Sequence, residues 1–134
     1  MDDVVRIVRP RDRMLPAQPT PGMRREEALS GDGFWVGLTS VDAGVTTGWH
    51  HHGGHDTYVY VLQGMLHLDF GPGGSGTADA RPDDFLHIPP GVVHREGTPG
   101  DDELRAVVVR VGSGELTVNV EGPDPISPPS AGGG

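Results

Sequence analysis

Histidines form the most distinctive cluster of potentially reactive side chains in this sequence. Three of them are consecutive, His50, His51 and His52, and His55 follows closely. Residues i and i+2 of a strand project from the same face, so His50 and His52 can direct two imidazoles to one point while His51 faces away. Imidazole is a ligand for zinc, copper, iron and nickel. The spacing therefore predicts two metal ligands on one strand.

Two ligands on one strand cannot complete a coordination sphere, so a third has to come from another part of the chain. The best candidate is His94, which follows the stiff turn Pro89-Pro90-Gly91. Such a turn can aim the next strand, and with it His94, into a barrel. The sequence therefore predicts a metal centre of His50, His52 and His94, whereas His67 is expected to face outward.

The composition narrows the remaining chemistry. There are no cysteines, and all ten basic residues are arginine, which excludes thiolate nucleophiles, Schiff-base lysines and a P-loop. The net charge of −9 opposes binding to nucleic acid and to an anionic membrane surface. No apolar run approaches the roughly 20 residues of a membrane span, and the charged start does not resemble a signal peptide. We therefore expect a cytoplasmic protein.

Short apolar or alternating runs, separated by Gly, Pro and Asp, must position these histidines. Runs of this kind are typical of an all-β sandwich or barrel. The expected strands are Phe34–Val41, Val45–His52, Thr57–Leu62, Met65–Phe70, Phe85–Ile88, Val92–His94, Leu104–Val111 and Leu116–Val120. Residues 71–80, which are rich in Gly, are expected to form a flexible loop, and Arg24–Leu29 to form one helical turn.

One hairpin is predicted in detail. Thr57–Leu62 and Met65–Phe70 flank Gln63-Gly64, a pair that suits a tight hairpin turn between antiparallel strands. Alternation along the two strands then separates an apolar core face from an outer face. The core face is expected to hold Thr57, Val59, Val61, Leu66, Leu68 and Phe70, and the outer face Tyr58, Tyr60, His67 and Asp69.

The histidines lie within two motifs that resemble those of the cupin family. The first cupin motif is Gly, five residues, His-x-His, three or four residues, Glu, six residues, Gly. The second is Gly, five residues, Pro-x-Gly, two residues, His, three residues, Asn. At the corresponding positions this chain has Gly44, His50, His52, Thr57 and Gly64, and then Asp83, Pro89, Gly91, His94 and Thr98. Both motifs occur in order and at the family's spacing.

The resemblance implies a single cupin β-barrel, also called a jelly roll or double-stranded β-helix. We expect an N-terminal arm over residues 1–30, packed on the barrel or on a partner subunit. The barrel is expected over residues 31–121 and a flexible tail over residues 122–134. Because cupins commonly pair through sheet edges, a homodimer is the expected assembly.

One departure from the motifs affects the site. Thr57 stands where the family has its glutamate ligand, and a hydroxyl is a poor ligand for a soft or borderline metal. His55, at the mouth of the strand, and Asp56, if the strand bulges, are alternative fourth ligands. His55, Asp56 and Thr57 are also the catalytic candidates. The default is a three-histidine site with open positions for water or substrate.

Three functions are compatible with such a site. Three neutral histidines leave the charge of a divalent ion uncompensated, which favours anionic, chelating substrates. Similarity to three-histidine cupin dioxygenases implies oxidation of a small enolisable (β-dicarbonyl) or phenolic compound, with Fe²⁺ favoured over Zn²⁺, Ni²⁺ or Mn²⁺. A redox-silent zinc or nickel site would instead suit cyclisation, isomerisation or lyase chemistry. The third possibility is a module that binds or senses a small molecule without turnover.

Overall fold

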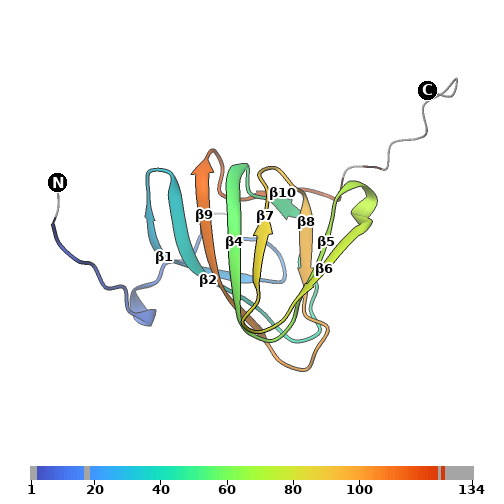
Figure 1. Cartoon of the computed structure of the whole chain (residues 1–134), viewed down its shortest axis with the longest axis horizontal. Helices are drawn as coiled ribbons and strands as arrows, with labels where there is room; N and C mark the ends of the chain where they lie inside the picture. Colours follow the sequence, from blue (N-terminus) through green and yellow to red (C-terminus); the bar gives the residue numbers. More distant parts are fainter. Residues whose placement is uncertain (1–2, 17–18, 124, 126–134) are drawn as a thin grey trace, which may run out of the picture.

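The computed structural model describes residues 3–16, 19–123 and 125, and it consists of two antiparallel sheets that enclose one core (Figure 1). The strand order is β1-β2-β9-β4-β7 in the first sheet and β10-β3-β8-β5-β6 in the second. The first sheet contains β1 (Arg24–Gly31), β2 (Phe34–Val41), β9 (Leu104–Ser113), β4 (Gly54–Gln63) and β7 (Phe85–Ile88). The second contains β10 (Val118–Asn119), β3 (His50–His51), β8 (His94–Gly97), β5 (Leu66–Phe70) and β6 (Gly76–Ala80). The all-β barrel expected from the sequence is confirmed.

The first strand lies where the sequence indicated a helical turn. Arg24–Gly31 pairs with β2 along its whole length, from Arg24 opposite Ser40 to Gly31 opposite Phe34. The helix-favouring residues of this segment are overridden because the edge of β2 supplies backbone partners that an isolated helical turn would lack. The helical turn was therefore a wrong prediction, and Arg24–Gly31 is the edge strand of the first sheet.

The predicted hairpin is also wrong, although its core face is right. β4 pairs with β7 and β9, whereas β5 pairs with β6 and β8 in the other sheet. Gln63-Gly64 thus carries the chain from one sheet to the other. A side chain at Gly64 would place Cβ 2.7 Å from the Glu103 carbonyl oxygen. The inward positions are unchanged, because alternation belongs to each strand whatever its partner.

The true partner of β5 comes from the segment expected to be a flexible loop. It contains the short 3-10 helix η2 (Pro72–Gly74) and then β6. β6 pairs with β5 from Leu66 opposite Ala80 to Phe70 opposite Gly76. The Gly-rich composition therefore marks only the turn of a hairpin, and the prediction of a loop through residue 80 was wrong.

The N-terminal segment reaches the free edge of β1. After the 3-10 helix η1 (Pro10–Asp12), Met14 exchanges two backbone hydrogen bonds with Glu27, and Arg13 forms a 3.2 Å ion pair with Glu26. An edge strand is shielded from other chains when a segment covers it in this way. The tail predicted over residues 122–134 lies almost entirely outside the described residues.

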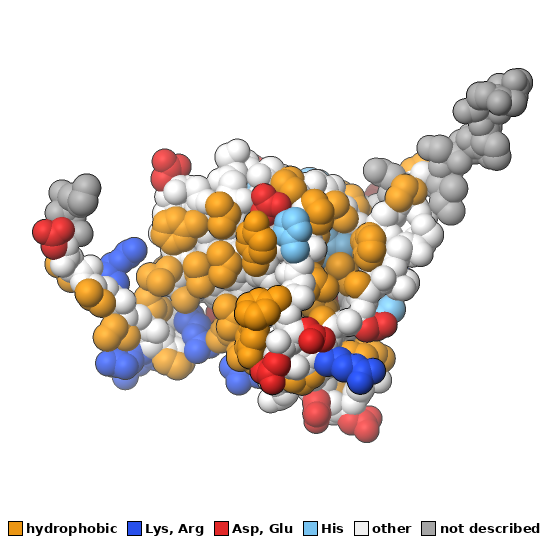
Figure 2. Space-filling view, viewed as in Figure 1, with side chains coloured by type: hydrophobic (Ala, Val, Ile, Leu, Met, Phe, Trp, Pro, Cys, Tyr) orange, Lys and Arg blue, Asp and Glu red, His pale blue; other side chains and the backbone are white. Residues whose placement is uncertain are grey.

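The outer face of the first sheet carries apolar side chains. Figure 2 shows hydrophobic side chains gathered over β2, β9 and β4, and the exposed residues there include Tyr58, Val111 and, on β7, Phe85. The homodimer expected from the sequence stays a prediction. Within the described part of the chain, no helix has the length and apolar character needed to cross a membrane.

Candidate metal centre

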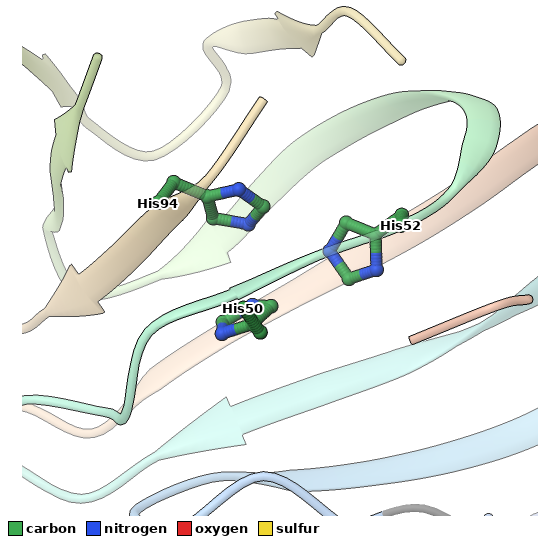
Figure 3. A group of neighbouring side chains, drawn as sticks. All are labelled: His50, His52 and His94. Carbon is green, nitrogen blue, oxygen red and sulfur yellow. The ribbon is translucent and has the colours of Figure 1, made fainter. Parts of the chain in front are cut away.

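The structure brings the three predicted ligands together inside the barrel (Figure 3). His50 begins β3 and lies directly opposite His94, which begins β8. His52 follows β3 with its ring on the same side, while His51 between them is half-buried. The ring centroids of His50 and His94 are 4.4 Å apart, and those of His52 and His94 are 5.0 Å apart. All three side chains are almost completely shielded from solvent.

Backbone carbonyls fix the tautomer of all three rings. The contacts are His50 Nδ1 to Gly48 O at 2.8 Å, His52 Nδ1 to Leu116 O at 2.8 Å and His94 Nδ1 to Val92 O at 2.9 Å. A carbonyl only accepts, so each Nδ1 carries the proton and donates it. Each Nε2 is then left with a lone pair, and one ligand atom from each ring lies within 4.8 Å of those of the other two. This arrangement is typical of metal-ligating histidines.

Burial favours the uncharged form of two of these histidines. Desolvation lowers the pKa of His50 and of His52, and the nearby Arg110 guanidinium lowers the pKa of His52 in addition. A neutral imidazole is the form that binds a metal ion. Within the described part of the chain, Nε2 of His50 and of His94 has no hydrogen-bond partner. Such buried, unpaired acceptors are costly unless another group occupies the space between them.

Glu96 is a member of the site that our sequence analysis missed. It follows His94 by two residues on β8, is 8% exposed, and places Oε1 3.5 Å from His94 Nε2 and 3.7 Å from His50 Nε2. A carboxylate that faces two lone pairs requires a proton or a cation between them. Two atoms that are each about 2.1 Å from one tetrahedral ion lie about 3.4 Å apart. These distances would let Glu96 share an ion with two of the rings, but the group whose ligand atoms all lie close enough to hold one ion is His50, His52 and His94, without Glu96.

The signal for Glu96 was present in the sequence. The i, i+2 rule that joins His50 to His52 also joins His94 to Glu96. The family motif treats this position as a spacer, and Glu96 was overlooked for that reason.

The three catalytic candidates differ in where they lie relative to the histidine cluster. Thr57 is on the inner face with an unpartnered Oγ1, beside a cavity of about 10 Å³ that His52 and Glu96 also line. His55 is buried, with its Nδ1 3.0 Å from the His52 carbonyl oxygen, but it lies outside the ligand group. The catalytic roles assigned to Thr57 and His55 stay predictions.

Asp56 is not brought to the centre. Its Oδ1 is 2.7 Å from His87 Nε2 on the outer face of the first sheet. β4 pairs with β9 without interruption from Gly54 to Val61, so there is no bulge that could turn Asp56 inward. The structure therefore gives no support to Asp56 as a ligand.

Two buried arginines form a second layer next to the histidines. Arg25 of β1 and Arg110 of β9 are each 3% exposed. Arg110 packs on the Trp35 ring at 4.7 Å and places NH2 3.5 Å from His52 Nε2. Burial, together with repulsion from Arg25, lowers the pKa of Arg110 to about 9, so it remains charged at neutral pH. Our sequence analysis did not include either arginine: it placed Arg25 in the N-terminal arm and treated Arg110 only as part of a strand.

The arginines line a pocket of about 520 Å³ at this end of the barrel. Its walls come from the arm, from β1, β2 and β9, and from the segment that leads to β10. Trp35 and Leu116 supply apolar surface, and Leu116 is also the residue whose carbonyl accepts from His52. The pocket therefore adjoins the histidine centre through Arg110 and Leu116.

The comparison with protein families agrees with this architecture. A family model for the cupin domain matches residues 37–110, more than half of the chain. This chain belongs to the cupin family. The histidine cluster lies within the matched region, and its three buried rings are consistent with a cupin metal site.

Solved structures with the same fold span most of this cupin. The polyketide cyclase RemF from Streptomyces resistomycificus shares 22% identity at a TM-score of 0.69, over 87% of this chain and 86% of that one. KdgF from a Halomonas species shares 18% identity at a TM-score of 0.62, over 81% and 96% of the two chains. A double-stranded β-helix protein from Klebsiella pneumoniae shares 19% identity at a TM-score of 0.66, over 78% and 90%. No curated protein sequence matches the chain.

Proposed function

We propose that this cupin is a metal-dependent dioxygenase that acts on a small enolisable (β-dicarbonyl) or phenolic compound. The observation that carries the proposal is the convergence of three buried imidazoles whose ring nitrogens lie close enough to hold one ion. A pocket large enough for a small organic molecule adjoins this point. The buried position of the ligands keeps bulk water away from the centre.

The residues around the centre would have different roles in binding and orienting the ligands. His50, His52 and His94 would hold a divalent transition metal through three nitrogens, with the Glu96 carboxylate beside two of the rings. A metal ion bound there supplies Lewis acidity toward an enolate or phenolate and, if it is iron, the capacity to react with dioxygen. The carbonyls of Gly48, Leu116 and Val92 hold the three rings in the ligand tautomer.

A redox-silent reaction is the second candidate. The similarity to RemF extends over 87% of this chain, and RemF is described as a polyketide cyclase. Cyclisation of an enolisable substrate requires Lewis-acid activation and no oxidant, so zinc or nickel on the same ligands would suffice. Isomerisation and lyase chemistry need the same activation. A protein that binds its ligand without turnover remains the outcome if neither reaction is found.

Metal content is the first measurement. The untagged protein is purified without air and analysed by mass spectrometry for iron, zinc, nickel and manganese. Near-stoichiometric iron, with oxygen uptake in the presence of acetylacetone or catechol, supports the dioxygenase. Zinc or nickel without oxygen uptake would replace it with the redox-silent reaction. Absence of any metal, even after reconstitution with each ion, would overturn both enzymatic proposals.

A further inference from the structure

Arg25 and Arg110 are charged side chains that are buried without forming an ion pair among the described residues, although the nearby Glu96 carboxylate acts to raise the pKa of both. Both are 97% shielded, and among the described residues no carboxylate forms an ion pair with either guanidinium. Arg25 NH1 donates to Thr20 Oγ1 at 2.8 Å, but its Nε and NH2 have no partner, and neither has Arg110 Nε. Buried charges in proteins are normally paired, so these unpaired donors indicate a missing anion.

The two guanidinium groups line the same pocket. Its volume is about 520 Å³, and the positive charge of Arg25 contributes to lowering the pKa of Arg110. The two like charges are thus close enough to repel each other inside the protein. An anion between them would relieve this repulsion and accept the unused hydrogen bonds. Guanidinium is well suited to that task because its planar donors match carboxylate geometry.

The surrounding contacts hold the arginines in place. The Thr20 hydroxyl that accepts from Arg25 donates in turn to Asn119 Oδ1 at 2.9 Å, which ties Arg25 to the β10 strand. Arg110 is fixed by the Trp35 ring at 4.7 Å. Preorganised donors lose little entropy when they bind a ligand. The pair is therefore built as a rigid subsite rather than as two mobile surface charges.

Acidic residues of the same pocket do not neutralise the pair. Glu27 is half-buried and accepts a hydrogen bond from Ser30, while Glu115 is exposed. Glu96 contributes one buried negative charge that partly offsets the two guanidiniums, but its Oε1 faces His50 and His94 and forms no ion pair with either arginine. With a divalent ion on the histidines, the buried groups would carry a net positive charge. The region therefore favours a negatively charged ligand.

We propose that Arg25 and Arg110 form an anion-binding subsite that holds a carboxylate of the substrate while its enol or phenol faces the histidine centre. Arg110 makes this geometry possible, because it lines both the large pocket and the small cavity shared by His52 and Glu96. The anion-binding role is independent of the reaction, whereas the chelating end of the substrate rests on the proposed function. The substrate class is thereby narrowed to small enolic or phenolic carboxylates.

The test compares matched acids and amides in the complete protein. Binding of 3,4-dihydroxybenzoate and 3,4-dihydroxybenzamide is measured by calorimetry on zinc-loaded protein, which avoids turnover. Benzoate and benzamide are measured on metal-free protein, where only the arginines can select the acid. We expect each acid to bind about 10- to 100-fold more tightly than its amide, as charge-assisted hydrogen bonds to a carboxylate require.

Arginine variants assign the preference to the subsite. Arg25→Gln and Arg110→Gln should each reduce the acid-to-amide ratio toward one, and Arg110→Lys should retain part of it. Arg105→Gln is the matched control, because Arg105 is on the same strand as Arg110 but its side chain is 44% exposed and does not line the pocket. Circular dichroism checks that each variant is folded.

The unmodified protein alone can overturn the proposal. Equal binding of benzoate and benzamide to metal-free protein would do so, whether or not the variants fold. A preference that survives in both Arg→Gln variants would place the carboxylate elsewhere and would also overturn the subsite. Neither result depends on oxygen uptake or on metal content, so failure of the subsite is distinguishable from failure of the proposed function.

Discussion

The two ends of the barrel interior differ sharply although the same strands build both. Along β4, the inward residues change from His55 and Thr57 to Val59 and Val61. Along β9 they change from Arg110 at one end to Val108, Ala106 and Leu104 at the other. Burial is equally complete at both ends, so it does not distinguish a structural core from a site. The chemistry of the buried side chains makes that distinction.

The two ends make opposite contributions to stability. Each apolar side chain that is removed from water favours folding by about 1.5–3 kcal/mol. The polar end instead contains unpartnered atoms of Arg25, His50, Thr57, His94 and Arg110. An unsatisfied buried polar group costs roughly 1–3 kcal/mol. We infer that the apolar end stabilises the fold while the polar end is held ready for ligands that satisfy its donors and acceptors.

The largest expected effect is the loss of metal at the polar end. His50→Ala, His52→Ala and His94→Ala should each reduce the metal content from about one ion per chain to near zero, because two imidazoles do not complete a site. Mass spectrometry of the reconstituted variants measures the content. His67→Ala is the control, since this ring lies on the outer face of β5. Equal metal loss in the control would contradict the assignment of ligands.

The next effect is loss of stability at the apolar end. Leu104 is 1% exposed, and Leu104→Ala should lower the free energy of unfolding by about 2–5 kcal/mol. Denaturant unfolding in the presence of a chelator measures it. Leu62→Ala, at a position that is 47% exposed, should cost far less. The folded Leu104 variant should still bind one metal ion; if it does not, the two ends are not separate in function.

A smaller effect is expected from the carboxylate that faces the histidines. Glu96→Gln keeps the shape of the side chain but removes its charge, and it should weaken metal binding about 10- to 100-fold. Competition with a chelator of known affinity gives the ratio. Glu121→Gln, on the surface, is the matched control. Unchanged affinity in Glu96→Gln would mean that Glu96 takes no part in holding the metal.

The smallest expected effect is a pH-dependent contribution to stability from His67, outside the barrel interior. His67 Nδ1 is 2.7 Å from Asp79 and Nε2 is 2.9 Å from Asp69, and these carboxylates raise its pKa above the usual value of 6.5. A raised folded-state pKa stabilises the protein below the unfolded value, and this stabilisation is lost as the pH rises through the folded value. His67→Gln should therefore lower Tm more at about pH 5.5 than at about pH 9. Equal changes in Tm at both pH values would contradict this assignment.

Much of the site could be predicted because it depends on local rules. The i, i+2 relation of His50 and His52 and the stiff turn before His94 predicted the three rings that the structure brings together. The same alternation predicted which side of β4 and β5 would be buried. Glu96 obeys the rule as well, since it follows His94 by two residues on β8, although the family motif contains no ligand at its position.

The partners of each strand could not be predicted in the same way. Alternation is fixed within one strand by the pleated backbone, whereas pairing depends on which distant segment supplies backbone donors and acceptors. The sequence alone therefore determined the all-β class, the three histidines that come together and the inner face of β4 and β5. Only the tertiary structure decided that β4 and β5 belong to different sheets and that Arg24–Gly31 is a strand. It also placed Arg25, Arg110 and the pocket beside the histidines, because residues so far apart in sequence meet only when both sheets close around one core.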